Sequence, residues 1–116
     1  MKEVNRSINY KGQELKLVFN LNVMETIQEE FGTLEKWGSM TDGESGEPNI
    51  KALKFGLMAM LNEGIDIENE ENDEKKPFFT SKQVGRIITE LGLENLTSDM
   101  NGVVIDSVKD DSGKNA

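Results

Sequence analysis

The stretch Ile50–Leu61, IKALKFGLMAML, decides the fold, because nine of its twelve residues are apolar. Its apolar positions do not form the single stripe of a surface helix; one set recurs at helical spacing and a second set spreads round the rest of the helix. The first set is Ile50, Leu53, Leu57 and Leu61, and the second is Phe55, Met58 and Met60. We therefore predict that this helix is the centre of a domain, with or without a partner protein against part of its surface.

The composition of the chain excludes several classes of function. Its 116 residues suffice for one small domain. The 22 acidic and 13 basic residues give a net charge of −9, which disfavours nucleic acid and anionic membranes as partners and favours proteins. Since the chain has no Cys and no His, disulfides, thiolate nucleophiles, imidazole bases and ordinary zinc sites are ruled out. We expect no metal and no cofactor.

The sequence predicts a cytoplasmic protein. No apolar run approaches the ~20 residues of a membrane span. The first residues, MKEVNRSINY, lack the apolar core of a signal peptide.

The segment before the central helix predicts a β-hairpin and a helix. Residues 5–19 alternate apolar and polar side chains around Lys11-Gly12, where Gly12 supplies the positive φ of a tight turn. A two-stranded sheet needs a cover over its apolar face. The next helix, capped by Asn20 and ended by Gly32, is the first candidate for that cover. Residues 33–37 are expected to form a short helical turn or loop.

Two segments are expected to be irregular. Gly38–Asn49 is rich in glycine and acids, and it lacks the Gly-Lys-Ser/Thr ending of a phosphate-binding loop. Asn62–Lys76 carries seven acidic residues in fifteen, which indicates a solvated loop or a docking surface for a basic partner. A calcium loop starting at Asp66 fails, because Glu71 and Pro77 stand where an EF-hand has Gly and Glu.

Two more helices complete the prediction. Thr80 and Gln83 form a capping box ahead of a helix that ends at Gly92. Residues 95–108 fit a helix by periodicity, although Asn101-Gly102 followed by Val-Val-Ile also fits a turn into a strand. We predict the helix.

The predicted fold class is therefore α+β and mostly helical. It consists of an N-terminal β-hairpin followed by about four α-helices around the central apolar helix. All of it belongs to one domain, residues 1–109. The polar tail, residues 110–116, is expected to be disordered.

A family resemblance lies in the segment INYKGQELKLVFNLNVMETIQEEFGTLEKW, residues 8–37. Its short hairpin has a Lys-Gly turn and the pattern Leu-x-Leu-x-Phe-x-Leu, and its helix ends in Glu-x-Phe-Gly before a Leu-x-x-Trp turn. This layout resembles the small tail assembly chaperones of long-tailed bacteriophages and prophages. The order and length of the later elements are also similar, so that the match covers roughly residues 7–108. It is a match of patterning, without an active-site signature.

The resemblance implies a non-enzymatic protein of the bacterial cytoplasm. Such a chaperone binds the tape-measure protein and tail-tube subunits before the tube polymerises, and it is expected to be absent from the mature virion. Apolar surface for a client and an acidic remainder for solubility suit that task. The predicted partner-binding residues are Trp37, Phe55 and Met58; the competing interpretation is that all three are ordinary core residues. Gly56 and Gly85 permit close helix contacts within the fold or through self-association.

Two other functions stay open. The first is a structural phage protein, either a tail-terminator or a head–tail connector subunit, which would also be small and acidic. The second is an acidic inhibitor that mimics DNA, although clustering of the acids in one segment argues against it. An enzyme is not expected, because the sequence places no nucleophile beside a base.

Overall fold

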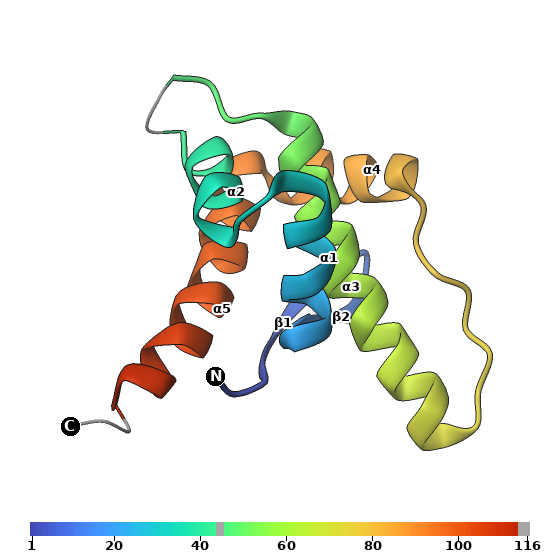
Figure 1. The fold of residues 1–116 in the computed structure, drawn as a ribbon. Helices are drawn as coiled ribbons and strands as arrows, with labels where there is room; N and C mark the ends of the chain where they lie inside the picture. The colour runs from blue at the N-terminus through green and yellow to red at the C-terminus, as the bar shows by residue number, and fades with distance from the viewer. Residues whose placement is uncertain (44–45, 114–116) are drawn as a thin grey trace.

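The fold is an antiparallel β-hairpin followed by five helices in the described residues, as Figure 1 shows. It comes from a computed structural model that describes residues 1–43 and 46–113, the last four by their backbone alone. This architecture confirms the predicted fold class, α+β and mostly helical. The elements are β1 (Val4–Tyr10), β2 (Gln13–Phe19), α1 (Leu21–Phe31), α2 (Leu34–Thr41), α3 (Ile50–Asn72), α4 (Ser81–Leu91) and α5 (Leu93–Gly113).

The hairpin turns at the two residues that the sequence indicated. Lys11 has φ 50° and Gly12 has φ 79°, the two positive values of the turn that best matches strand twist. The register pairs Ile8 with Leu15, so that these apolar side chains share one face of the sheet. The predicted cap is also present, because the Asn20 side chain accepts a hydrogen bond from the third residue of α1.

Helix α3 contacts four of the six other elements. It packs against β2, α1, α2 and α4, and Figure 1 shows it running diagonally across the molecule. Cover on more than one side is what its distribution of apolar residues predicted. The contact between α3 and β2 is larger than that between α1 and β2, so α3, and not the predicted α1, is the main cover of the hairpin.

The expected short turn at residues 33–37 is a full helix, α2, and its Trp37 belongs to the core. Trp37 is 1% exposed, and its Nε1 donates a hydrogen bond of 2.9 Å to the carbonyl oxygen of Ala52. The ring lies on Gly56, where an added Cβ would meet Trp37 Cζ2 at 2.2 Å. Gly56 therefore serves a close contact within the fold. Because α2 continues to Thr41, the first part of the predicted connection Gly38–Asn49 is helical.

The prediction of a solvated loop at residues 62–76 is wrong for most of its length, because α3 continues to Asn72. Gly64 explains part of this continuation: it is buried, and an added Cβ there would lie 3.1 Å from the carbonyl oxygen of Lys16 in β2. The hairpin thus supports the helix beyond its apolar half. Glutamates are also good helix formers. The helix stops at Asp73, which adopts the left-handed conformation with φ 53°.

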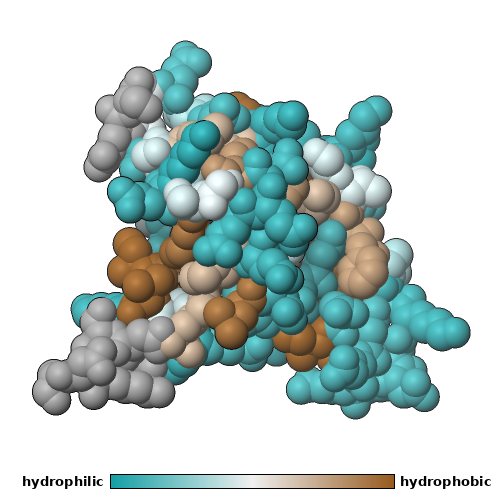
Figure 2. Space-filling model, in the orientation of Figure 1, coloured by the Kyte–Doolittle hydropathy of each residue, from teal (hydrophilic) through white to brown (hydrophobic). Residues whose placement is uncertain are grey.

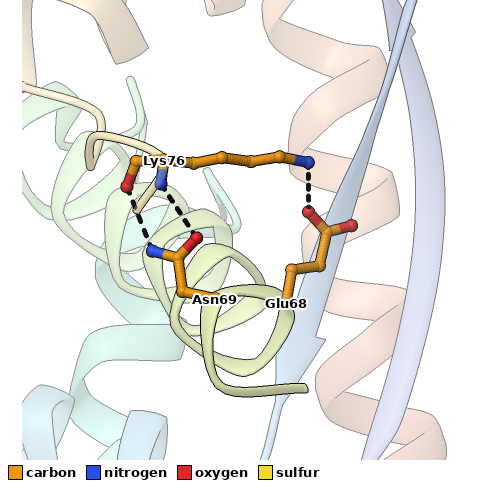
Figure 3. A network of polar contacts seen from close by, with 3 residues as sticks. All are labelled: Glu68, Asn69 and Lys76. Atoms are coloured by element: carbon orange, nitrogen blue, oxygen red, sulfur yellow. Dashed lines mark hydrogen bonds and ion pairs between the residues drawn. The ribbon is translucent and has the colours of Figure 1, made fainter. Parts of the chain in front are cut away.

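A connector, residues 73–80, returns from the end of α3 to α4. Figure 3 shows how α3 holds its first part. The Asn69 side-chain amide accepts a hydrogen bond of 2.9 Å from Lys76 N and donates one of 3.1 Å to Lys76 O. The Lys76 ammonium pairs with a Glu68 carboxylate oxygen at 3.0 Å. The hydrogen bond to Glu68, followed by its negative charge and that of Glu74, raises the pKa of Lys76 above its ordinary value of 10.5.

The last two helices follow their predicted signals. Thr80 and Gln83 form the capping box of α4, and Gly92, with φ 99°, ends that helix. The choice of helix over strand for the last segment is confirmed by α5. The backbone of α5 continues to Gly113, into the segment 110–116 that the sequence predicts to be disordered. The rest of that predicted tail, residues 114–116, lies outside the described residues.

Candidate functional site

A groove of about 370 Å³ lies between α1, α3 and the connector, and we name it the α1–α3 groove. Its apolar lining comes from all three elements: Val23 of α1, Phe55 and Met58 of α3, and Phe78 of the connector. Ala59 adds to this apolar lining, and polar side chains form the rest of the wall. The groove is therefore an apolar surface built on two helices and bounded by polar groups, a common arrangement for a binding site.

Two of the three residues predicted to contact a partner, Phe55 and Met58, lie in this groove. They are three positions apart on α3 and so face the same direction. Both are half-buried. The Phe55 ring is fixed by an edge-to-face contact with Phe31 of α1, with centroids 5.4 Å apart and an interplanar angle of 83°. One part of each side chain thus belongs to the core, and the other part is open to the groove.

Phe78, which the sequence analysis did not single out, is the most exposed apolar side chain of the groove at 53%. Its place is set by Asn62 of α3. The Asn62 side chain accepts a hydrogen bond of 2.8 Å from Phe79 N and donates one of 3.1 Å to Phe79 O. The sequence held one sign of this exposed side chain, the pair Phe78-Phe79 within a polar segment. Adjacent residues in an extended segment point in opposite directions, so one ring of such a pair faces outward when the other faces the fold.

The polar wall of the groove also fixes the position of α1 relative to α3. A Glu63 carboxylate oxygen accepts hydrogen bonds from Asn20 Nδ2 at 2.7 Å and from Asn22 Nδ2 at 3.2 Å. These bonds join the start of α1 to the middle of α3. Asp66 lies one turn further along α3 and also lines the groove, so two carboxylates border the apolar surface.

Trp37, the third predicted contact residue, is not in the α1–α3 groove. It lies against a second groove of about 430 Å³ between α2 and α5, together with Leu34, Val104 and Ile105. Its side chain is 1% exposed, so the ring itself offers almost no surface to a partner and this prediction is corrected. The exposed apolar side chain of this groove is Ile105, at 59%, and Val108, at 44%, lies further along α5 outside the groove. Figure 2 shows hydrophobic side chains gathered over α5.

The requirements of a metal site and of a membrane span can be compared with the described part of the chain. Residues 1–43 and 46–109 contain no group of three or more His, Cys, Asp or Glu side chains placed to hold a metal ion. Within the described helices, none combines the length and the apolar character needed to cross a membrane. No protein-family model, no curated protein and no solved structure matches this chain. The grooves and the sequence pattern therefore carry the proposal for function.

Proposed function

We propose that this chain is a phage tail assembly chaperone. In this role it is a non-enzymatic protein of the bacterial cytoplasm that binds the tape-measure protein and tail-tube subunits during tail assembly and leaves before the virion is complete. The sequence pattern of residues 8–37 supports the family, and the α1–α3 groove supports the activity.

The observation that carries the proposal is the apolar surface of Phe55, Met58 and Phe78, which line one groove. Phe78 is 53% exposed and the other two side chains are half-buried, so this surface is accessible to a partner. A groove on two packed helices suits the apolar face of an amphipathic client helix, whose side chains enter at helical spacing. Met58 suits clients of varied sequence, because its unbranched thioether adapts to different shapes.

The charge of the molecule suits a chaperone as well. Glu63 and Asp66 border the groove, and the chain as a whole has a net charge of −9. A loaded complex would keep that excess charge and with it its solubility, while the client's apolar face is covered. The two carboxylates would also favour client helices that carry Lys or Arg beside their apolar face.

The direct test is co-expression of the tagged chain with the tape-measure and tail-tube proteins encoded beside it, followed by affinity capture. We expect both proteins to be captured. Phe78→Ser should weaken capture of the tape-measure protein by about tenfold, because it removes an aromatic anchor from the groove. Ile105→Ser is the matched control, since Ile105 is equally exposed, at 59% against 53%, but lies in the other groove; we expect it to leave capture unchanged.

Two results would contradict this function. One is that neither protein is captured by the parent chain. The other is that mass spectrometry of purified particles finds the chain as a stoichiometric component, which would favour a tail-terminator or connector subunit.

A further inference from the structure

A positively charged surface lies where three parts of the fold meet: the hairpin turn, the start of α3, and α4. It is a groove of about 600 Å³, and we name it the basic groove. It shares no lining residue with the α1–α3 groove. The side chains that matter for its chemistry are Tyr10, Lys11, Ile50, Lys54, Lys82 and Arg86.

The basic groove concentrates positive charge in a protein whose net charge is negative. Four of the 13 basic residues line it, with Glu90 as the one acidic lining residue. Two basic side chains elsewhere have carboxylate partners: Arg6 pairs with Asp99 at 3.3 Å and Lys76 pairs with Glu68 at 3.0 Å. Within the described residues, none of the four cations of the groove has a carboxylate within 4.0 Å.

The fold holds these cations close to one another. Lys82 and Arg86 are four residues apart on α4 and therefore lie on one face of that helix, a spacing at which like charges destabilise it. Lys54 reaches across from α3 and lies over Gly85, where an added Cβ would be 3.4 Å from its ammonium nitrogen. These cations repel one another in the free protein. An anionic ligand between them would replace that repulsion with attraction.

The groove also has an apolar part. Ile50 is 50% exposed, although Leu53 and Leu57 on the same helix are fully buried. Tyr10 carries the Lys11 ammonium 5.5 Å above the centre of its ring. A fitting ligand would therefore combine carboxylates with an apolar side chain.

We propose that the basic groove binds an acidic peptide segment of a partner protein. Carboxylates of that segment pair with Lys54, Lys82 and Arg86, and an apolar side chain packs on Ile50. A peptide fits better than a nucleic acid, because a polyanion that extended beyond the groove would meet the acidic remainder of the surface. The inference does not rest on the proposed function, since it concerns other residues and another ligand.

The test is fluorescence anisotropy with a fluorescein-labelled peptide, Glu-Glu-Leu-Glu-Glu-Leu-Glu-Glu, titrated with the full chain at low salt. We expect binding that weakens as salt is added and that is lost when Gln replaces every Glu of the peptide. Lys82→Gln combined with Arg86→Gln should weaken binding by about tenfold or more, because two charge-assisted contacts are lost. Lys36→Gln combined with Lys75→Gln changes the net charge equally outside the groove and should leave binding within about twofold.

Each alternative gives its own result. Equal binding by both double variants, or by the Gln peptide, would overturn the proposal. Tighter binding of a single-stranded oligonucleotide than of the peptide would replace the peptide with a nucleic acid. If the peptide does not bind, but sedimentation shows self-association that Lys82→Gln with Arg86→Gln abolishes, the occupant is a second copy of this chain. Phe78→Ser should not affect peptide binding, which separates this proposal from the proposed chaperone function.

Discussion

Replacing Gly56 with Ala tests the packing on which α3 depends. The added Cβ would lie 2.2 Å from Cζ2 and 2.8 Å from Cε2 of Trp37. The ring has little freedom to retreat, because it is 1% exposed and its Nε1 is bonded to the carbonyl oxygen of Ala52 at 2.9 Å. Either α2 moves away from α3 or the indole leaves its hydrogen bond.

Three effects set the size of the change. Ala favours a helix interior over Gly by about 1 kcal/mol. Forcing an extra carbon into a packed core costs roughly 1–3 kcal/mol, and a buried indole N–H that loses its acceptor costs about 1–3 kcal/mol more. The steric and hydrogen-bond costs exceed the gain in helix propensity, so we expect Gly56→Ala to lower the free energy of unfolding by about 2 kcal/mol.

Urea unfolding followed by far-UV circular dichroism measures this change, and Gly38→Ala is its control. Gly38 also lies inside a helix, α2, but an added Cβ there would meet nothing within 4 Å. Gly38→Ala should therefore raise the free energy of unfolding by about 0.5–1 kcal/mol, the propensity gain alone. In a Trp37→Phe background, which removes the clashing part of the ring, Gly56→Ala should cost much less. Equal stability of Gly56→Ala and the parent, or a gain in stability, would refute the reasoning.

Two other predictions concern a buried hydroxyl and a surface pair. Ser107 is fully buried, and its Oγ has no hydrogen-bond partner among the described residues. Ser107→Ala should therefore raise the free energy of unfolding in urea by about 1 kcal/mol; a loss of stability would mean that the hydroxyl is satisfied. The raised pKa of Lys76 means that its pair with Glu68 adds stability below the ordinary value of 10.5 and loses it as the pH rises through the raised value. The difference in unfolding free energy between the parent and Glu68→Gln should therefore be largest near neutral pH and vanish at strongly alkaline pH, and a difference that does not change with pH would contradict this.

The parts of the fold that the sequence predicted correctly are those set by local chemistry. The positive φ of Gly12, the cap at Asn20 and the capping box of Thr80 and Gln83 each involve residues within a few positions of one another. The length of α3 is different, because Gly64 is buried against a strand that lies far away in the sequence. The run of acids around it gave a composition typical of a loop, and the contact that keeps it helical has no local signal.

The residues of the candidate site also fall into two groups: those that the sequence pattern indicated, and those whose position depends on contacts between distant segments. Phe55 and Met58 were predicted because the apolar residues of α3 exceed what one buried face requires, and both line the α1–α3 groove. Trp37 was predicted on residue type alone, whereas its burial depends on the space above Gly56. Phe78 was missed because its exposure follows from the Asn62 bonds to the neighbouring Phe79, a contact between segments that the sequence does not show.

Helix α3 is thus both the core of the fold and part of each proposed binding surface. Leu53, Leu57 and Leu61 are buried, whereas Phe55 and Met58 line the α1–α3 groove. Ile50 and Lys54, near the start of the same helix, line the basic groove. An apolar distribution too broad for one stripe is therefore accounted for by contacts on different sides of one helix. Because the buried leucines hold α3 in place between the hairpin and the other helices, each groove has a rigid wall, which lowers the entropic cost of binding a partner.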